Sequence, residues 1–241
     1  MASEEQQWSI FDWVRNPPEV YAKMRASGPI HWNEDYKGWL VIDYDLAREL
    51  LKDPRLSSDT TEALKLTAFP KRSREQVEPL LDLLRSWLIF SDPPYHTALR
   101  KVLNPYFAKS ALAERAKSIE MHARNLLSNC EGEWDFMEKF AGPLPARVMA
   151  DLMGLPYDAI LDFLSWDAQL ASFIGSAVRS PDVTAGALMA MRYQKQFFNQ
   201  VIAAAAPDSF LVSLKSALEQ EDLFSKDDFW KILSMILATG T

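Results

Sequence analysis

The sequence predicts a mainly α-helical protein with a small β-hairpin near the N-terminus. Apolar residues recur at helical spacing in most segments from residue 17 onward. Only one pair of short segments, close to the start, has the pattern of two strands joined by a turn. Glycine is scarce, with 8 residues, which disfavours β-sandwiches and phosphate-binding loops. The chain shows neither a β–α–β alternation nor a linker, so we expect residues 1–241 to form a single domain.

The composition indicates a globular protein of a reducing compartment. The 241 residues carry a net charge of −7 and are 48% hydrophobic, ordinary values for a chain that buries a sizeable core. The excess of carboxylates argues against a nucleic-acid-binding surface, which needs a basic patch. The one cysteine, Cys130, excludes an internal disulfide, and the acidic N-terminus lacks the pattern of a signal peptide. No apolar run is long enough for a membrane span, so we expect a cytoplasmic protein.

The first expected elements are a short helix, a hairpin and a second helix. Paired prolines open the helix at residues 17–26, and a Gly-Pro pair ends it. Residues 30–34 and 39–42 are short segments on either side of a polar turn, residues 35–38, which predicts two antiparallel strands. An aspartate, at position 43 or 45, then caps a helix that continues to about residue 52.

The middle of the chain begins with a polar stretch, residues 55–70, which we expect to be a loop. Residues 76–88 return to helical spacing, with Pro79 in the first turn. Asp92 is expected to cap the next helix, which has two prolines in its first turn. That helix ends before Pro105, because proline lacks the donor N–H and clashes with the preceding turn.

The second half of the chain is expected to be helix after helix. Ser110 is placed to cap the first of these helices, and residues 133–136 are a candidate for a short edge strand. Ser225 and Asp228 form a capping box before the last, strongly apolar helix. The expected helices cover residues 111–129, 141–153, 157–173, 185–206, 209–220 and 229–237, with a loop over 175–183.

The ten residues 91–100, Ser-Asp-Pro-Pro-Tyr-His-Thr-Ala-Leu-Arg, place a basic face beside an apolar one. His96 and Arg100 are four residues apart, so their side chains leave the helix in the same direction. Leu99 begins an apolar stripe at helical spacing on the neighbouring face. Two basic side chains on one face are suited to holding an anion, and the same spacing also describes a plain solvated face.

Other common chemistries lack their residue patterns. His31, His96 and His122 have no second His, Cys or carboxylate at a zinc-like spacing, so we expect no metal site made of these side chains. The sequence contains no G-x-S-x-G nucleophile elbow and no phosphate loop. Cys130 is followed by Glu131 and Glu133, which make it a poor nucleophile, and we expect it to be a partly buried spectator.

The stretch 91–100 closely resembles the C-helix signature of soluble, bacterial-type cytochromes P-450, the haem-thiolate monooxygenases. That signature reads roughly Asp-Pro-Pro-x-His-Thr-x-x-Arg. Further segments resemble the same family in the same order, so the similarity covers essentially the whole chain. They are residues 21–25, 28–30, 39–42, 53–59, 141–145, 151–156 and 208–211, together with the closing helix. The resemblance implies the N-terminal part of the cytochrome P-450 fold, a single partial domain that ends inside the I helix.

The resemblance implies a haem b site at two places in the chain. His96 and Arg100 correspond to the family residues that bind the haem propionates. Thr239 and Gly240 correspond to the part of the I helix that crosses the haem, with Thr239 in place of the usual Ala or Gly. In the family an acid and an alcohol follow and relay protons to bound oxygen. Both would come just after Thr241, so we expect no catalytic residue within this chain.

The family's substrate contacts imply a largely hydrophobic small molecule, oxidised with dioxygen and two electrons. The implied contact residues are Trp87, Leu88, Phe90, Phe173, Met235 and Ala238. Trp87, Leu88 and Phe90 belong to a variable loop before the C helix, and the last two residues belong to the I helix. Each of these apolar side chains is equally compatible with a place in the core or in helix packing.

The resemblance stops before the family's C-terminal half, which holds the cysteine loop. The thiolate of that loop ligates the iron, and Cys130 matches neither its sequence context nor its position. We therefore expect this chain alone to lack the iron ligand and to need the missing C-terminal half. A ferredoxin-type redox partner would supply the electrons. Two alternatives stay open: a non-catalytic relative that uses this half for binding or interaction, and an all-α interaction module without haem.

Overall fold

The computed structural model describes residues 15–241 except residues 36, 129 and 177–179. The described part is mainly helical with one two-stranded antiparallel sheet, which confirms the predicted fold class. The chain divides into two compact units, residues 1–57 and 58–241. None of the helices in the described part combines the length and the apolar character that a membrane span requires.

The described part of the smaller unit, residues 15–57 without residue 36, contains two helices and the hairpin. Its elements are α2 (Pro17–Ser27), β1 (Ile30–Asn33), β2 (Gly38–Val41) and α3 (Tyr44–Leu50). The strands pair in antiparallel register with Trp32 opposite Trp39, and the two indole rings meet edge to face, 5.3 Å between centroids. Asp43 caps α3, because its carboxylate accepts a hydrogen bond of 2.9 Å from the backbone N–H of Leu46. Leu40 of β2 and Ile42, which follows the strand, pack against the buried side of α2.

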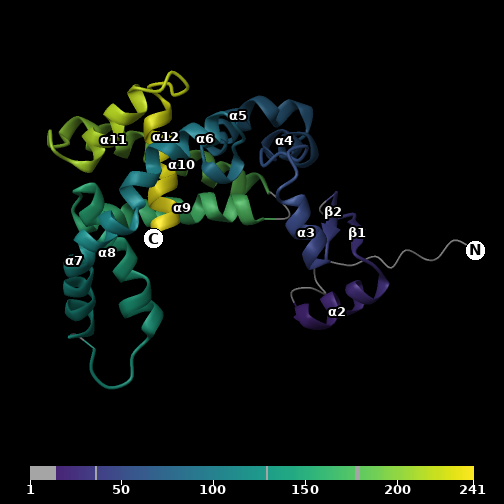
Figure 1. The fold of residues 1–241 in the computed structure, drawn as a ribbon, viewed down its shortest axis with the longest axis horizontal. Helices are drawn as coiled ribbons and strands as arrows, with labels where there is room; N and C mark the ends of the chain where they lie inside the picture. Colours follow the sequence, from purple (N-terminus) through teal and green to yellow (C-terminus); the bar gives the residue numbers. More distant parts are fainter. Residues whose placement is uncertain (1–14, 36, 129, 177–179) are drawn as a thin grey trace, which may run out of the picture. The chain divides into compact units, whose positions relative to one another are not determined.

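The larger unit is built from helices, drawn from blue to yellow in Figure 1. Its α-helices are α4 (Thr61–Ala68), α5 (Arg74–Arg85), α6 (Tyr95–Leu103), α7 (Lys109–Leu127), α8 (Pro143–Met153), α9 (Tyr157–Gly175), α10 (Pro181–Ala204), α11 (Phe210–Glu219) and α12 (Asp228–Gly240). Shorter helical turns are η1 (Lys71–Ser73), η2 (Leu88–Phe90), η3 (Asn104–Phe107) and η4 (Met137–Ala141).

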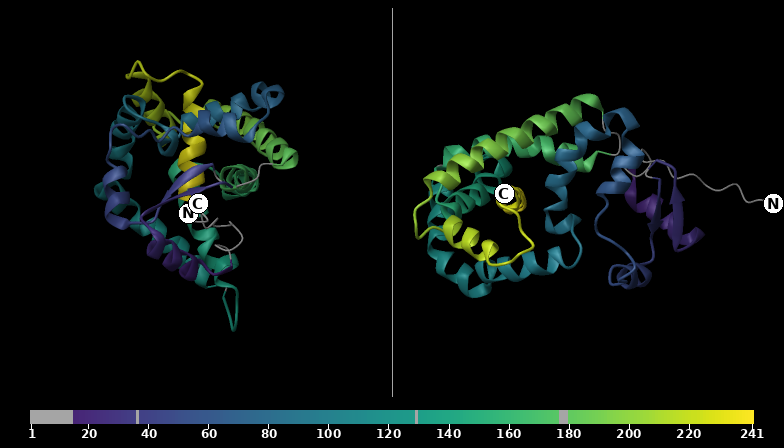
Figure 2. Two further views of the ribbon diagram at one scale, coloured as in Figure 1. Left: turned by 90° about the vertical axis from the view of Figure 1, so that its right-hand side faces the viewer. Right: turned by 90° about the horizontal axis from the view of Figure 1, so that it is seen from above.

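Helix α12 runs through the middle of the larger unit, with the other helices of that unit around it (Figures 1 and 2). Every residue from Phe229 to Leu237 is buried, including both polar ones. A helix that is apolar on all sides is stable only when neighbours cover all of its sides. The sequence of α12 therefore makes it the centre of the core, and α8 and α10 pack directly against it.

The segment between residues 55 and 70, predicted to be a loop, contains helix α4. Asp59 fixes the start of this helix, because its carboxylate accepts from the backbone N–H of Thr61 at 2.9 Å. Leu64 and Ala68 pack against the main core. A helix of eight residues is not stable alone, so these tertiary contacts decide its formation, and they are not visible in the sequence.

Two predicted N-caps are wrong. Asp92 does not cap α6; its carboxylate accepts a hydrogen bond of 2.9 Å from the backbone N–H of Ser58 instead. Ser110 lies inside α7, which begins at Lys109 with no side-chain cap. In both cases the residue type was suitable for a cap, but the long-range partner or the earlier helix start determined its role.

Two helices begin earlier than predicted. Helix α5 begins at Arg74, so Pro79 lies inside the helix and not in its first turn. Helix α10 begins at Pro181, because Ser180 caps it through a hydrogen bond of 3.2 Å from a backbone N–H of the first turn. Residues 177–179 of the loop predicted over 175–183 lie outside the described residues.

The predicted edge strand at residues 133–136 does not form in the described part of the chain. A strand needs a paired neighbour, and among the described residues the sheet consists of β1 and β2. The segment bends into η4, a wide helical turn closed by a hydrogen bond of 2.9 Å from Gly142 to the carbonyl of Met137. Phe136 instead packs against Phe140 of η4, with 5.3 Å between the centroids of the two tilted rings.

Candidate functional site

Helix α6 presents the predicted basic face. Ala98, Leu99 and Val102 are buried on one side and anchor the helix on the core. His96 is half-buried and Arg100 is exposed, and both border the same open hollow on the other side. In the described part of the chain, neither side chain has an ion-pair or hydrogen-bond partner. The helix therefore carries two neighbouring basic groups that the described protein groups do not satisfy.

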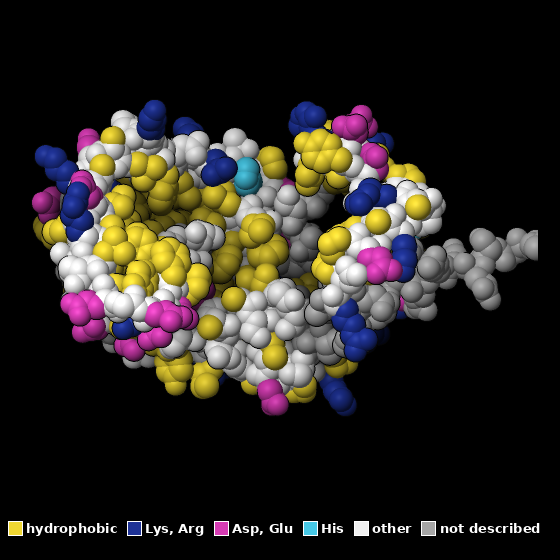
Figure 3. All heavy atoms as spheres, turned by 90° about the horizontal axis from the view of Figure 1, so that it is seen from below, with side chains coloured by type: hydrophobic (Ala, Val, Ile, Leu, Met, Phe, Trp, Pro, Cys, Tyr) yellow, Lys and Arg dark blue, Asp and Glu magenta, His cyan; other side chains and the backbone are white. Residues whose placement is uncertain are grey.

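A cavity of about 390 Å³ lies next to this face of α6. Figure 3 shows a hollowed face of the molecule whose walls are largely hydrophobic. Among the described residues that line the cavity, Arg100 and Arg115 are the charged ones and none is a carboxylate. Its lining comprises Leu88, Arg100, Leu103, Asn104, Tyr106, Phe107, Leu112, Arg115, Ile119, Val148, Met149, Leu152, Met235, Ile236, Thr239 and Gly240. An apolar cavity with positive charge at its wall favours a ligand with an apolar body and an anionic group.

Thr239 and Gly240, the predicted cofactor contacts of α12, both line this cavity. The hydroxyl of Thr239 donates to the carbonyl of Met235 at 2.9 Å, within its own helix. Gly240 allows close packing of α12 on α8, because a Cβ at this position would lie 2.5 Å from the sulfur of Met149.

The predicted substrate contacts separate into three groups. Leu88 and Met235 line the cavity, and the backbone N–H of Leu88 donates to the sulfur of Met235 at 3.0 Å. Trp87 and Phe173 are buried in the main core. Phe90 and Ala238 are half-buried against that core and do not contribute to the cavity lining. The structure thus brings Arg100, Thr239, Gly240, Leu88 and Met235 together, while His96 borders only the open hollow.

Arg115 is a cavity residue that the sequence reasoning missed. It lies on α7 between Leu112 and Ile119, which also line the cavity. The spacing of these three residues places the arginine within the apolar stripe of the helix. A charged residue in an apolar stripe can indicate a functional site in the sequence, because such a residue is rarely buried without a function or a partner.

The side of the site formed by α7 and α8 is held by a polar cluster. Asp151 on α8 accepts hydrogen bonds from Ser118 and from His122 on α7, the second with 2.7 Å between Nε2 and Oδ2. Burial opposes ionisation of Asp151, but these two hydrogen bonds and the charge of Arg115 hold its pKa below the ordinary value. The cluster joins the two helices that form one wall of the cavity.

The chain resembles bacterial cytochromes P-450 in sequence. The polyketide biosynthesis cytochrome P-450 PksS of Bacillus subtilis is 26% identical over 95% of this chain and 57% of its own length. The monooxygenase PikC of Streptomyces venezuelae is 31% identical over 79% of this chain and 43% of its own. No protein-family model matches the sequence.

Solved structures of the same family share the fold. A myxobacterial cytochrome P-450 in complex with myristic acid superposes with a TM-score of 0.77 at 26% identity, over 95% of this chain and 57% of its own. The tirandamycin C-bound monooxygenase TamI gives a TM-score of 0.75 at 29% identity, over 95% of this chain and 58% of its own.

The chain belongs to the cytochrome P-450 superfamily. It spans about half the length of the curated relatives that it matches, which is consistent with an N-terminal portion of the P-450 fold.

The cavity and the open hollow offer groups of the kinds that the edge of a haem requires. Haem is a flat, largely apolar molecule with two carboxylates, and the cavity and the hollow beside it provide apolar walls and unpaired basic groups. Cys130 is half-buried, donates through sulfur to the carbonyl of Leu126 at 3.4 Å, and does not line the cavity. Among the described residues, no group of three or more His, Cys, Asp or Glu side chains is arranged to hold a metal ion.

Proposed function

We propose that this P-450 chain forms one side of the haem and substrate sites of a monooxygenase that oxidises a largely hydrophobic small molecule with dioxygen and two electrons. One observation carries the proposal. His96 and Arg100 have no partner in the described part of the chain, and Arg100 also lines an apolar cavity that reaches Thr239 and Gly240 of α12. The family membership of the chain supports haem b as the cofactor.

In this proposal His96 and Arg100 bind the propionates of the haem. A guanidinium is well suited to this task, because it pairs with a carboxylate through two parallel hydrogen bonds. Thr239 and Gly240 form the wall of α12 next to the haem, where the absence of a side chain at Gly240 keeps the helix close to Met149. When bound, the haem supplies the iron at which dioxygen is activated. We assign no catalytic residue and no iron ligand to this chain.

The proposed substrate is largely hydrophobic. Leu88 and Met235 line the cavity and would contact the substrate directly. The other four predicted contacts would shape the site from behind these side chains; they are Trp87, Phe90, Phe173 and Ala238. The names of similar proteins support this class, since solved structures of similar proteins hold myristic acid, epothilone B and testosterone. We further propose a ferredoxin-type redox partner, a cytoplasmic location, and completion of the single P-450 domain by the C-terminal half of the fold.

Haem titration of the purified 241-residue chain, followed by absorbance, tests the proposal. We expect saturable binding that weakens roughly ten- to a hundredfold in Arg100→Ala, because a charge-assisted hydrogen bond of about 1.5–3 kcal/mol is lost. His96→Ala should also weaken haem binding. The matched control is Arg72→Ala, which removes an exposed arginine at η1, away from the cavity lining. The proposal is wrong if the chain does not bind haem, or if all three variants bind it equally well.

A further inference from the structure

Helix α12 carries a buried lysine that the proposed function leaves unused. Lys231 is only 5% exposed, and its ammonium group lies 2.7 Å from a carboxylate oxygen of Asp82 and 3.3 Å from one of Asp228. A lysine is rarely buried unless it is paired, because removing its charge from water is costly. Burial lowers the pKa of Lys231, but the two carboxylates outweigh this effect and hold the pKa above its ordinary value. The ammonium group is therefore a fixed positive charge at the edge of the core, where a buried lysine meets the half-exposed carboxylate of Asp82.

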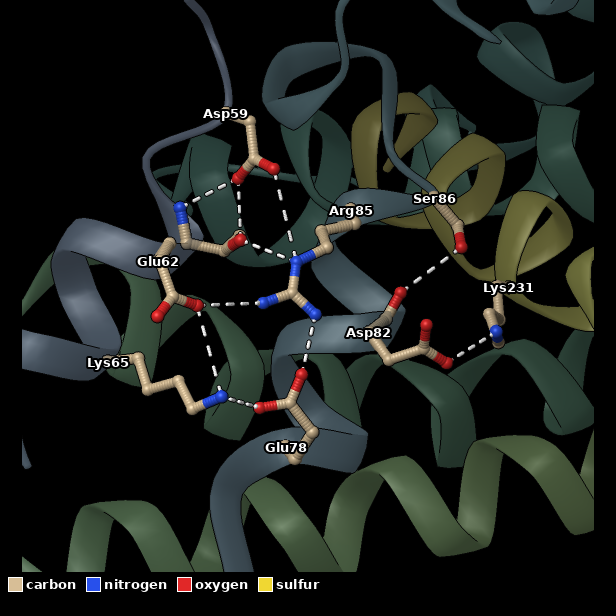
Figure 4. Close-up of polar contacts among 9 residues, drawn as sticks. Asp59, Glu62, Lys65, Glu78, Asp82, Arg85, Ser86 and Lys231 are labelled. Carbon is tan, nitrogen blue, oxygen red and sulfur yellow. Dashed lines mark hydrogen bonds and ion pairs between the residues drawn. The ribbon is translucent and has the colours of Figure 1, made fainter. Parts of the chain in front are cut away.

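The partner of Lys231 belongs to α5, whose polar face is anchored on both sides (Figure 4). Asp82 reaches Lys231 on α12, while Glu78 and Arg85 on the same helix reach α4. Glu78 pairs with Lys65 of α4 at 2.5 Å, and Arg85 donates to the hydroxyl of Thr61 at 2.8 Å. The opposite face of α5 is buried in the core through its leucines. Helix α5 is thus held between α4 and α12 by charged groups as well as by packing.

The end of α5 leads directly into the candidate substrate segment, residues 87–90. Met235 lies four residues after Lys231 on α12, so both side chains leave the same face of that helix. Lys231 contacts Asp82, and the sulfur of Met235 accepts the backbone N–H of Leu88. Two successive turns of α12 therefore contact the end of α5 and the segment that follows it.

We propose that Lys231 is a positioning residue: through its ion pair with Asp82 it fixes the end of α5 on α12, and so sets where residues 87–90 lie in the candidate substrate site. The role of this segment in substrate binding rests on the proposed function. The physical reason is that a buried ammonium group permits little movement of its partner. A sliding motion of α5 along α12 would separate Lys231 from Asp82 and leave charge in the core with fewer partners. An apolar side chain at the same place would permit such a motion at lower cost.

Hydrogen–deuterium exchange of the full 241-residue chain tests this positioning role. Asp82→Asn is the sharpest variant, because Asp82 is half exposed and Lys231 keeps its contact with Asp228 when the interhelical ion pair is lost. We expect exchange in peptides covering residues 86–91 to become roughly tenfold faster, while α7 and α9 exchange as in the unmodified chain. Glu75→Gln is the matched control, since it neutralises an exposed carboxylate in the first turn of the same helix.

Variants of Lys231 provide a second comparison. Lys231→Met should reproduce the faster exchange, and Lys231→Arg, which keeps the charge, should restore most of the protection. Unchanged exchange at residues 86–91 in both Asp82→Asn and Lys231→Met would overturn the proposal. Exchange that rises equally throughout the larger unit would also overturn it, because the pair would then stabilise the fold without positioning this segment.

Ligand binding separates this proposal from the proposed function. With myristate as the apolar probe, Asp82→Asn should weaken binding about fivefold or more and leave haem affinity within about twofold, since Asp82 does not touch the haem side of the site. Equal myristate affinity in the variant and the unmodified chain contradicts a role in the substrate site. If the unmodified chain binds neither haem nor myristate, the proposed function fails, whereas the exchange data still decide whether Lys231 fixes the segment.

Discussion

His122 and Asp151 join α7 to α8 through a hydrogen bond of 2.7 Å between the imidazole Nε2 and a carboxylate oxygen. The same carboxylate accepts a hydrogen bond from Ser118, so one aspartate connects two helices that line the candidate site. The pKa of Asp151 lies below its ordinary value although burial opposes this shift, because both hydrogen bonds favour the ionised form. The ionised carboxylate is therefore part of the folded structure of this wall.

This pair predicts a stability that depends on acid pH. For a carboxyl group with a lowered pKa, the stabilisation is complete above the ordinary pKa of 3.8 and is lost as the pH falls through the lower folded value. Asp151→Asn should lower the free energy of unfolding by about 1 kcal/mol at pH 7, a modest value because the side chain is partly solvated. Urea unfolding between pH 7 and pH 3 should show the difference shrinking below about pH 4. Glu133→Gln, at an exposed site, should show no such pH dependence.

Asp167 on α9 predicts the opposite pH dependence. Burial raises its pKa to about 6, so its ionised form is disfavoured in the folded protein. A carboxyl group with a raised pKa loses stability as the pH rises from its ordinary value through the folded one. Asp167→Asn should therefore increase the free energy of unfolding at pH 7, by about 1–3 kcal/mol, and change it little at pH 3.5. An unchanged stability at pH 7 in urea unfolding would show that the charge of Asp167 is solvated.

Truncation of Phe173 should greatly lower the free energy of unfolding. Its side chain is fully buried and stacks near Phe69, with 6.2 Å between ring centroids. Phe173→Ala should lower the free energy of unfolding by about 3–5 kcal/mol, because a cavity replaces the ring. Phe173→Leu should cost markedly less, since most of the volume is kept. Similar midpoints for the alanine variant and the unmodified chain in urea unfolding would contradict the core position of this residue.

Substitutions at Gly240 and Met149 should be energetically coupled. A Cβ at residue 240 would lie 2.5 Å from the Met149 sulfur, so Gly240→Ala forces the end of that side chain to move. We expect a loss of about 1–3 kcal/mol in the free energy of unfolding. The double variant Met149→Ala/Gly240→Ala has room for the added methyl group. The substitution Gly240→Ala should therefore lower the free energy of unfolding less in the Met149→Ala background than in the unmodified chain. Additive losses in this double-mutant cycle would show that the two residues do not compete for space.

The sequence predicts the long helices well because their apolar spacing records the face that they bury. It fails where a partner distant in the sequence decides the structure. Helix α4 depends on contacts with α5, and the predicted cap Asp92 instead accepts a hydrogen bond from Ser58, 34 residues earlier in the chain. Residues 133–136 have a plausible strand composition, yet no described strand pairs with them. Local patterns contain no information on such partners.

The candidate site was predictable only in part, because the sequence shows helical spacing but not which distant segments meet. His96 and Arg100 follow from helical spacing together with the family signature, and the structure leaves both without a partner in the described residues. The apolar contacts were harder, because a tryptophan or phenylalanine has the same appearance in a sequence whether it lines a cavity or fills a core. Trp87 and Phe173 are core residues, whereas Leu88 and Met235 line the cavity. The sequence does not distinguish Lys231 from an exposed lysine, since only the fold shows that it is buried.

The central position of α12 has a consequence for how the chain is made. This helix is synthesised after the helices that surround it, and its buried side chains are the surface on which α8 and α10 pack. Those earlier helices leave the ribosome with apolar faces that stay uncovered until residues 228–240 have emerged. The larger unit should therefore acquire protease resistance late in translation and in one step, and nascent chains halted before α12 should depend on chaperones to stay in solution.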